Sequence, residues 1–187
     1  MIDPVPQVAP AVAIRRERPH DQADAAAARA VNIAAFPTDA EAALLDALRA
    51  AGDYDPAHSL LVEIEGTVVA HCLLTATTLE RADGSTVVGR IVALGPIAVL
   101  PAWQGRGIGT RVVRAALDLC ERDGAAAVVL VGNPTYYARF GFGQARPQGL
   151  LPPGHWRDEV WLARRLGSWT PDDVGVVCYA RPFMEMD

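Results

Sequence analysis

The sequence predicts a single α/β domain built on a mixed sheet, and three observations lead to this prediction. The chain has 187 residues, of which 51% are apolar, so it is long enough to bury one compact core. Segments with helical periodicity alternate with apolar segments typical of strands. Neither a repeat nor a linker separates these segments, so we expect one domain over residues 11–187.

The individual elements follow from local signals. Residues 1–10 contain three prolines and are expected to form a loose tail. Pro37 ends the first helix. Thr38 and Glu41 form a predicted capping box for the second helix, which Gly52 ends. The expected order is a strand at 12–16, helices at 20–36 and 39–51, strands at 59–65, 67–79 and 89–100, a helix at 110–123, a strand at 127–131, a short helix at 134–140, and strands at 160–166 and 174–181.

The strand at 89–100 contains Pro96, which has no N–H to donate to a neighbouring strand. We therefore expect this strand to bulge or to lose its neighbour at that point. Tight turns are expected at Glu65–Gly66 and at Asp83–Gly84, because glycine accepts the left-handed backbone that such turns require.

Composition and charge exclude several functions. All 17 basic residues are arginine, so a lysine nucleophile, a Schiff base and a phosphate-binding lysine are ruled out. The net charge of −5 argues against a nucleic-acid partner. The cysteines and histidines are scattered, so we expect no metal site and a reducing, cytoplasmic location. No apolar run reaches the roughly 20 residues of a membrane helix, so no membrane partner is expected.

The most informative segment is Gln104–Thr110, which joins a buried strand to a helix and is rich in glycine. Glycine lets the backbone turn and lets a ligand approach the amides. The first amides of a helix have no internal partner and carry a partial positive charge, so the segment is suited to bind a pyrophosphate. On the glycines alone, a solvated turn beside a basic helix face is an equally good interpretation.

Two other glycine motifs do not fit this segment. The phosphate loop of nucleotide triphosphatases needs a lysine, which the chain lacks. The dinucleotide-binding fingerprint needs a third glycine at Thr110 and an acidic residue after the next strand, where Gly132 and Asn133 stand instead.

Two motifs occur together near the middle of the chain. Gln104, Gly107 and Gly109 form the pattern Q-x-x-G-x-G after a strand, and Tyr136–Phe142 has the sequence YYARFGF. At this separation the two motifs resemble those of the GNAT superfamily of acyl-CoA-dependent N-acyltransferases. Residues 129–142 look most like a bacterial branch of predicted N-acetyltransferases.

The resemblance implies a mostly antiparallel sheet flanked by helices, with a central pair of parallel strands that splay apart. It also explains Pro96, because in this family the strand before the glycine loop bulges and its exposed backbone pairs with the pantetheine arm of coenzyme A. The implied co-substrate is acetyl-CoA, without a metal. The residues implied to bind it are Ile97, Ala98, Val99, Gln104, Gly105, Arg106, Gly107, Ile108, Gly109, Thr110, Asn133 and Tyr137.

The implied reaction is direct attack of a neutral amine on the bound thioester in a ternary complex. Tyr137 is implied as the acid that protonates the departing thiolate, and a purely packing aromatic is the alternative. His71 is the best single candidate for the base by its reference pKa, and a satisfied core histidine is the alternative. Glu63, Glu65 or a chain of water molecules are no worse supported as the base.

The implied acceptor is a primary amine on a small molecule or a protein. Its identity, the acyl length and the existence of a homodimer stay open. A GNAT fold that binds acyl-CoA without transferring the acyl group is the alternative to an enzyme, and the intact Tyr137 favours the enzyme. Four acidic residues are candidates for holding a cationic amine: Asp53, Asp55, Asp158 and Glu159.

Overall fold

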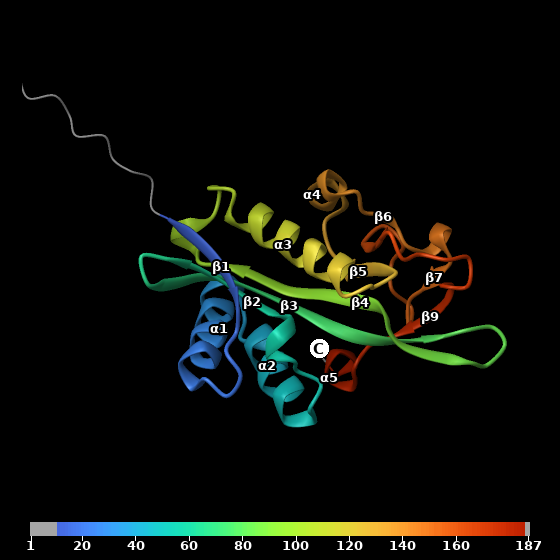
Figure 1. Ribbon diagram of the computed structural model, residues 1–187, viewed down its shortest axis with the longest axis horizontal. Coiled ribbons are helices and arrows are strands. Elements are labelled where there is room, and N and C mark those ends of the chain that lie inside the picture. Colours follow the sequence, from blue (N-terminus) through green and yellow to red (C-terminus); the bar gives the residue numbers. More distant parts are fainter. Residues whose placement is uncertain (1–10, 186–187) are drawn as a thin grey trace, which may run out of the picture.

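The computed structural model describes residues 11–185, in which one sheet runs through the molecule between two layers of helices (Figure 1). The predicted tail over residues 1–10 lies outside the described residues, as do the last two residues. Within the described part, no helix has the length and apolar character needed to cross a bilayer. The elements in chain order are β1 (Val12–Arg16), α1 (Gln22–Ala35), α2 (Ala40–Ala51), β2 (Ser59–Ile64), β3 (Thr67–Glu80), β4 (Thr86–Val99), α3 (Ile108–Arg122), β5 (Ala127–Val131), α4 (Pro134–Tyr137), β6 (Gly143–Gln144), β7 (Leu150–Leu151), β8 (Trp161–Arg165), β9 (Gly175–Cys178) and α5 (Arg181–Met184).

The sheet has the strand order β1-β2-β3-β4-β5-β8-β6, and β9 pairs both with the far half of β3 and with β7. Among the described strands, only the pairs β4–β5 and β7–β9 are parallel. The predicted mixed, mostly antiparallel sheet flanked by helices is therefore confirmed. Figure 1 shows α1, α2 and α5 on one face of the sheet and α3 and α4 on the other.

The two longest strands, β3 and β4, form a hairpin with arms of 14 residues each. Arg81 and Ser85 close its turn through a backbone hydrogen bond of 2.9 Å, and the Asp83 carboxylate accepts from the Ser85 N–H. The tighter turn between β2 and β3 places Glu65 and Gly66 at φ angles of 50° and 77°. Both turns lie where the sequence predicts them.

Two apolar layers hold the helices against the sheet. Leu45 and Leu48 of α2 pack on Leu61 and Leu73 of the sheet, and all four side chains are buried. Burying one such leucine stabilises the fold by about 1.5–3 kcal/mol. On the other face, α3 buries a stripe of residues at helical spacing. The stripe consists of Ile108, Val112, Val113, Ala116, Leu117, Leu119 and Cys120.

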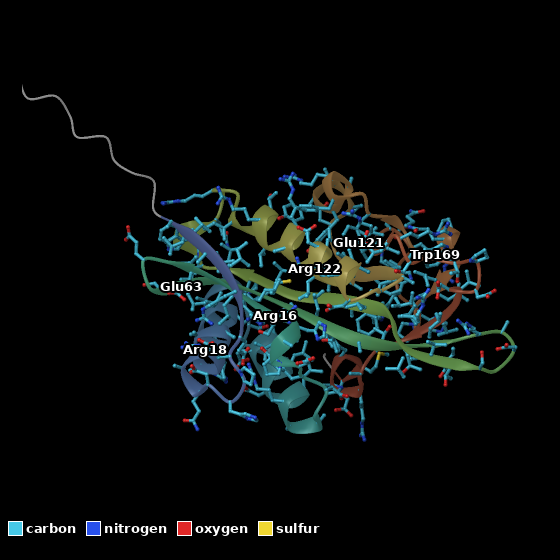
Figure 2. All side chains as sticks on the ribbon, viewed as in Figure 1. Arg16, Arg18, Glu63, Glu121, Arg122 and Trp169 are labelled. Atoms are coloured by element: carbon cyan, nitrogen blue, oxygen red, sulfur yellow. The ribbon has the colours of Figure 1, made fainter. Side chains whose placement is uncertain are left out.

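Polar contacts fix the C-terminal end of α3 to the last third of the chain. Glu121 accepts a hydrogen bond of 3.0 Å from the backbone N–H of Gly167, close to the loop that carries Trp169 (Figure 2). The Arg165 guanidinium lies 4.4 Å from the centre of the Trp169 ring, within the range of a cation–π contact. The loop between β8 and β9 is therefore attached to α3 as well as to the sheet.

The start of α2 differs from the prediction. The helix begins at Ala40 after Asp39, and Asp39 makes no side-chain capping bond. Thr38 Oγ1 accepts one long bond of 3.4 Å from the Ala40 N–H, and Glu41 lies at the second helical position. The predicted capping box is therefore wrong, because the turn before the helix places Thr38 one residue too early.

Two further boundaries differ from the prediction. Helix α3 begins at Ile108, two residues earlier than expected, because Gly107 adopts the left-handed conformation directly before it. The last predicted strand ends at Cys178, and Arg181 opens the short helix α5. Pro182 explains this change, because proline fits the first turn of a helix and cannot extend a strand ladder.

Strands β4 and β5 run side by side only for a short distance. Their parallel pairing ends where Ala93 lies opposite Val129. The register between β3 and β4 shifts by one residue at Gly95–Pro96, whose peptide bond is cis. The predicted bulge at Pro96 is therefore confirmed. Beyond it, the edge of β4 that faces β5 is open.

Candidate active site

The glycine-rich segment borders a cavity of about 410 Å³ between the end of β4, the start of α3 and helix α4. Gly105 and Gly107 have φ angles of 73° and 79°, a conformation that other residues adopt only with strain. Within residues 11–185, no side chain caps the start of α3. The N–H groups of its first turn therefore have no hydrogen-bond acceptor within the helix and lie beside the cavity. The lining residues are Val99, Trp103, Gln104, Gly105, Gly107, Ile108, Gly109, Thr110, Tyr136 and Arg139.

Three side chains shape this glycine-loop cavity. Gln104 donates its amide to the Val99 carbonyl at 3.0 Å, which ties the loop to the end of β4. Arg139 lines the cavity and stacks on Tyr136, with 4.7 Å from its guanidinium carbon to the ring centre. Arg106 stacks on Trp103 at 5.0 Å and does not line the cavity. Arg139 therefore brings a positive charge to the cavity wall, and Arg106 lies on the adjoining loop between the lining residues Gly105 and Gly107.

Sequence reasoning missed Arg139, although one signal was present. It follows Tyr136 by three residues, so a helical segment places both on the same face. Its Nε also donates to the Tyr136 carbonyl at 3.0 Å, which holds the guanidinium near the cavity. An arginine beside unpaired helix amides strengthens the attraction for a phosphate group.

A second cavity of about 430 Å³ opens where β4 and β5 separate. We call it the split-strand cavity. Residues of α2 and α5 contribute to its lining, whereas residues of α3 and α4 contribute to the lining of the glycine-loop cavity. Figure 1 shows these two pairs of helices on opposite faces of the sheet. The lining residues of the split-strand cavity are Phe36, Glu41, Leu44, Ala93, Leu94, Gly95, Pro96, Ile97, Val131, Tyr137, Trp156, Tyr179 and Phe183.

The neighbouring side chains of Tyr136 and Tyr137 line different cavities. Tyr136 lines the glycine-loop cavity and Tyr137 lines the split-strand cavity. Their rings are 5.0 Å apart and nearly perpendicular, so each restrains the other. Burial raises the pKa of Tyr137, and the nearby Cys72 and Tyr136 raise it further. The Tyr137 phenol therefore carries its proton at neutral pH.

The open edge of β4 presents the backbone of alternate residues. The Leu100 N–H donates to the Val69 carbonyl of β3 at 2.9 Å, so the backbone of Leu100 faces β3. Because successive residues face opposite sides of a strand, Ala98 also faces β3, whereas Ile97 and Val99 face the open edge. Of the three predicted residues in this strand, Ile97 and Val99 present backbone groups to a ligand, and Ala98 does not.

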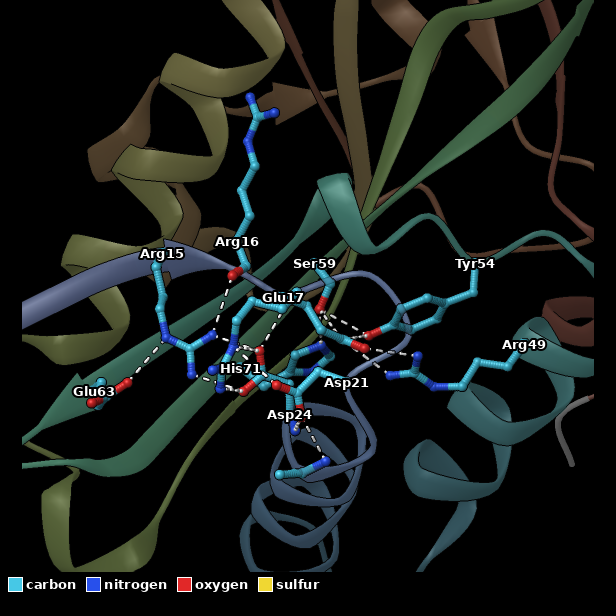
Figure 3. Close-up of polar contacts among 12 residues, drawn as sticks. Arg15, Arg16, Glu17, Asp21, Asp24, Arg49, Tyr54, Ser59, Glu63 and His71 are labelled. Atoms are coloured by element: carbon cyan, nitrogen blue, oxygen red, sulfur yellow. Dashed lines mark hydrogen bonds and ion pairs between the residues drawn. The ribbon is translucent and has the colours of Figure 1, made fainter.

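His71 lies in a buried polar network away from both cavities (Figure 3). Asn32 donates to the Ala28 carbonyl and to His71 Nδ1 at 2.9 Å, which leaves the proton of the neutral ring on Nε2. That nitrogen lies 3.1 Å from Ser59 Oγ. Burial lowers the pKa of His71 to about 4. This geometry favours the alternative that His71 is a satisfied core residue, because neither ring nitrogen can reach a substrate.

The same network holds a buried carboxylate in place. Glu17 receives hydrogen bonds from Ser59 at 2.8 Å and Tyr54 at 2.5 Å, and Arg49 pairs with it at 2.8 Å (Figure 3). Burial alone would raise the pKa of Glu17, but these bonds outweigh it and hold the pKa below its usual value. The network joins β1, α2, β2 and β3 and fixes the helices that border the split-strand cavity.

The remaining predicted residues lie elsewhere. Asn133 caps α4, with its side chain accepting from the Thr135 N–H at 2.9 Å, so it supports the helix that carries Tyr137. Glu63 pairs with Arg15 at 3.0 Å and Glu65 lies in the β2–β3 turn, so neither reaches a cavity.

The acidic candidates for the acceptor also lie apart from Tyr137. Asp53 and Asp55 border a larger cavity of about 590 Å³, beside the end of α3, which contains none of the residues predicted to bind the co-substrate. Asp158 pairs with Arg146 at 2.7 Å and Glu159 lies 3.4 Å from Arg157. The acidic residue that does line the split-strand cavity is Glu41, which the sequence prediction had assigned to helix capping.

Comparison with known proteins agrees with this geometry. The model of the acetyltransferase (GNAT) family matches residues 26–142. The chain belongs to the GNAT acetyltransferase family. The match contains the glycine loop, the split strands and α4, and ends before the C-terminal strands.

Two curated GNAT relatives of Escherichia coli (strain K12) are both described as uncharacterized N-acetyltransferases. YjhQ is 36% identical over 122 residues, which cover 65% of this chain and 66% of YjhQ. YhbS is 31% identical over 149 residues, which cover 79% of this chain and 86% of YhbS.

Two solved GNAT structures share the whole fold. The structure of E. coli YhbS in complex with CoA superimposes with a TM-score of 0.83 at 27% identity, covering 96% of each chain. A GNAT acetyltransferase from Brucella melitensis in complex with acetyl-CoA gives a TM-score of 0.72 at 32% identity, covering 92% of this chain and 98% of that one.

Proposed function

We propose that this GNAT protein transfers an acetyl group from acetyl-CoA to a primary amine by direct attack in a ternary complex. One observation carries the proposal. The strands β4 and β5 separate after Ala93, and the split lies between the glycine-loop cavity on one face and the split-strand cavity, lined by Tyr137, on the other. This arrangement supports two substrates meeting at the split from opposite faces of the sheet.

The residues of the glycine-loop cavity fit coenzyme A. The unpaired amides at the start of α3 and the Arg139 guanidinium suit the pyrophosphate. The backbone of Ile97 and the N–H of Val99, whose carbonyl already accepts from Gln104, suit the amide groups of the pantetheine arm, which need both donors and acceptors. Glu41, Tyr137 and apolar side chains line the split-strand cavity, where the arm would end. Bound acetyl-CoA supplies an acetyl group activated as a thioester.

The chain itself contributes two groups to the transfer. A backbone N–H on the open edge of β4, at Ile97 or Val99, donates to the carbonyl oxygen as negative charge develops there. Tyr137, which keeps its proton at neutral pH, donates that proton to the departing sulfur. A small-molecule or a protein amine fits this scheme. A cytoplasmic location, expected from the cysteine content, stays part of the proposal.

The proposal is tested by incubating the purified protein with acetyl-CoA and a panel of primary amines and measuring thiol release. We expect release with at least one amine, and a strong loss of release in Tyr137→Phe. CoA binding by calorimetry without thiol release from any amine would instead support the binding-module alternative. Absence of both CoA binding and thiol release from a folded protein would refute the proposal.

A further inference from the structure

Glu41, in the first turn of α2, is an acidic residue whose carboxylate has no partner among the described residues. Its Oε2 atom is shielded from solvent and has no hydrogen-bond partner in residues 11–185. Its side chain also forms no ion pair within that range. A buried carboxylate oxygen without a partner is unfavourable, because it loses its water and gains nothing in return. Such a group in a cavity indicates that a bound ligand supplies the missing partner.

Helix α2 gives the Glu41 carboxylate no hydrogen-bond donor. The capping box predicted for Thr38 and Glu41 does not form, and the start of α2 receives only the long bond from the Ala40 N–H to Thr38. In the first turn of α2, Glu41 has a favourable interaction with the helix dipole, which leaves its Oε2 without a partner. By contrast, the buried glutamate Glu17, which pairs with Arg49 of α2, has three hydrogen-bonding partners, whereas Glu41 is half-buried with one shielded oxygen. The fold therefore satisfies one of these carboxylates and leaves the other directed to the cavity.

The walls of the split-strand cavity select the partner. Leu44, Leu94, Ile97, Phe36 and Phe183 are among the apolar and aromatic side chains that surround it. No arginine lines it among the described residues, and the chain has no lysine. A carboxylate in an apolar cavity without a neighbouring cation attracts a cationic group that carries an apolar body.

We propose that Glu41 binds the ammonium group of the acceptor, and that the acceptor is a primary amine on an apolar, aromatic-sized body. This inference rests on the proposed function, since it places the acceptor beside Tyr137. Trp156, Tyr179 and Phe183 supply the aromatic side of the cavity against which such a body packs. Polyamines and sugar amines carry further charges or hydroxyls, for which the lining side chains offer few polar groups: the Glu41 carboxylate, the Tyr137 and Tyr179 hydroxyls and the Trp156 indole N–H.

The position of Glu41 also accounts for the protons. The ammonium gives one proton to the Glu41 carboxylate, which passes it to solvent after the reaction. The neutral nitrogen forms the C–N bond to the acyl carbon, the C–S bond breaks, and the sulfur takes a proton from Tyr137. The second proton lost by the nitrogen restores Tyr137, so the products are the N-acetylamine, the free thiol and one released proton.

The test measures amine binding separately from acetyl transfer. Calorimetry in the presence of CoA uses 2-phenylethylamine as the cationic probe and 2-phenylethanol as its uncharged counterpart. Glu41→Gln removes the charge and keeps the shape, and Glu65→Gln in the β2–β3 turn is the matched control. We expect Glu41→Gln to weaken 2-phenylethylamine binding at least tenfold and to leave 2-phenylethanol and CoA binding unchanged. With acetyl-CoA as co-substrate, the kcat/KM of Glu41→Gln should fall by a larger factor than its affinity for 2-phenylethylamine.

Several results would overturn the inference. One is an unchanged Kd for 2-phenylethylamine in folded Glu41→Gln. Another is a wild-type protein that binds 2-phenylethylamine no more tightly than 2-phenylethanol. A fall in kcat/KM no larger than the loss of affinity would remove the proton-accepting role. Failure of the proposed function looks different, because the wild type would then bind the amine through Glu41 and release no thiol.

Discussion

Gly132, directly after β5, offers a sharp test of the position of Tyr137. A Cβ atom at Gly132 would lie 2.5 Å from Tyr137 Cε2 and 3.0 Å from both Tyr137 Cδ2 and Leu130 Cδ1. The φ angle of Gly132 is not in the left-handed region, so alanine is compatible with its backbone. Gly132→Ala therefore acts by pushing on the Tyr137 ring rather than by straining the main chain.

The size of the effect follows from these distances. Carbon atoms in contact are normally about 3.5–4.0 Å apart, so the ring must move by roughly 1 Å or more. A misplacement of about 1 Å in a catalytic arrangement can reduce the rate about 100-fold. We expect kcat for thiol release to fall about 10- to 100-fold in Gly132→Ala. Overpacking should lower the free energy of unfolding by about 1–3 kcal/mol.

The assay is a double-mutant cycle of thiol release at saturating acetyl-CoA, with Gly132→Ala, Tyr137→Phe and the double variant. Gly154→Ala is the matched control, because a Cβ there meets no atom within 4 Å. If Gly132→Ala acts by displacing the hydroxyl, it should cost little further activity in the Tyr137→Phe background. A folded Gly132→Ala protein with the wild-type kcat, or an undiminished loss in the double variant, would refute the reasoning.

Three further predictions follow from the same geometry. Tyr137→Phe should lower kcat about 10²- to 10⁴-fold with CoA affinity unchanged, and the defect should shrink at high pH, where the thiolate leaves unaided; a wild-type kcat would remove Tyr137 from the mechanism. Gly109→Val should raise the Kd for CoA at least tenfold in calorimetry. A Cβ at this position would lie 3.0 Å from Tyr136 Oη and 3.7 Å from Val99 Cγ2, so the valine side chain would enter the glycine-loop cavity. An unchanged Kd in a variant that melts like the wild type would contradict the assignment of this cavity to CoA. Between its unfolded pKa of about 6.5 and its folded pKa of about 4, His71 binds more protons in the unfolded state, so urea titrations should show about 2 kcal/mol less stability at pH 5 than at pH 7. An NMR titration of the native protein in which His71 protonates near pH 6.5 would contradict that prediction.

Local chemistry explains which parts of the fold could be predicted from the sequence. Gly52 ends α2 with a φ angle of 79°, because glycine tolerates a left-handed backbone, and Pro96 marks the bulge in β4, because proline has no N–H to donate. Both properties belong to the residue itself, whatever surrounds it. The glycine pattern from Gln104 likewise predicts a loop with free amides. These signals depend on neighbours in the chain, so no knowledge of the tertiary structure is needed to interpret them.

The side chains of the candidate site were harder to predict because their roles depend on distant segments. The Thr38 and Glu41 pair has capping-box spacing, yet the actual helix start places Glu41 against strand β4 and helix α5. His71 has the pKa of a base as a free residue, but Asn32 and Ser59 enclose it in the folded chain. Spacing along the sequence carries no information about such partners, which are 12 and 39 positions away from His71.

The C-terminal part of the chain contributes to only one of the two cavities beside the separation of β4 and β5. Every residue that lines the glycine-loop cavity falls between Val99 and Arg139, within the family match. Three aromatic walls of the split-strand cavity, Trp156, Tyr179 and Phe183, lie beyond the end of that match. Substitutions in this C-terminal portion can therefore reshape one chamber without disturbing the other. Under the proposed function, this architecture would let acceptor preference change through the C-terminal segment while the coenzyme A site stays as it is.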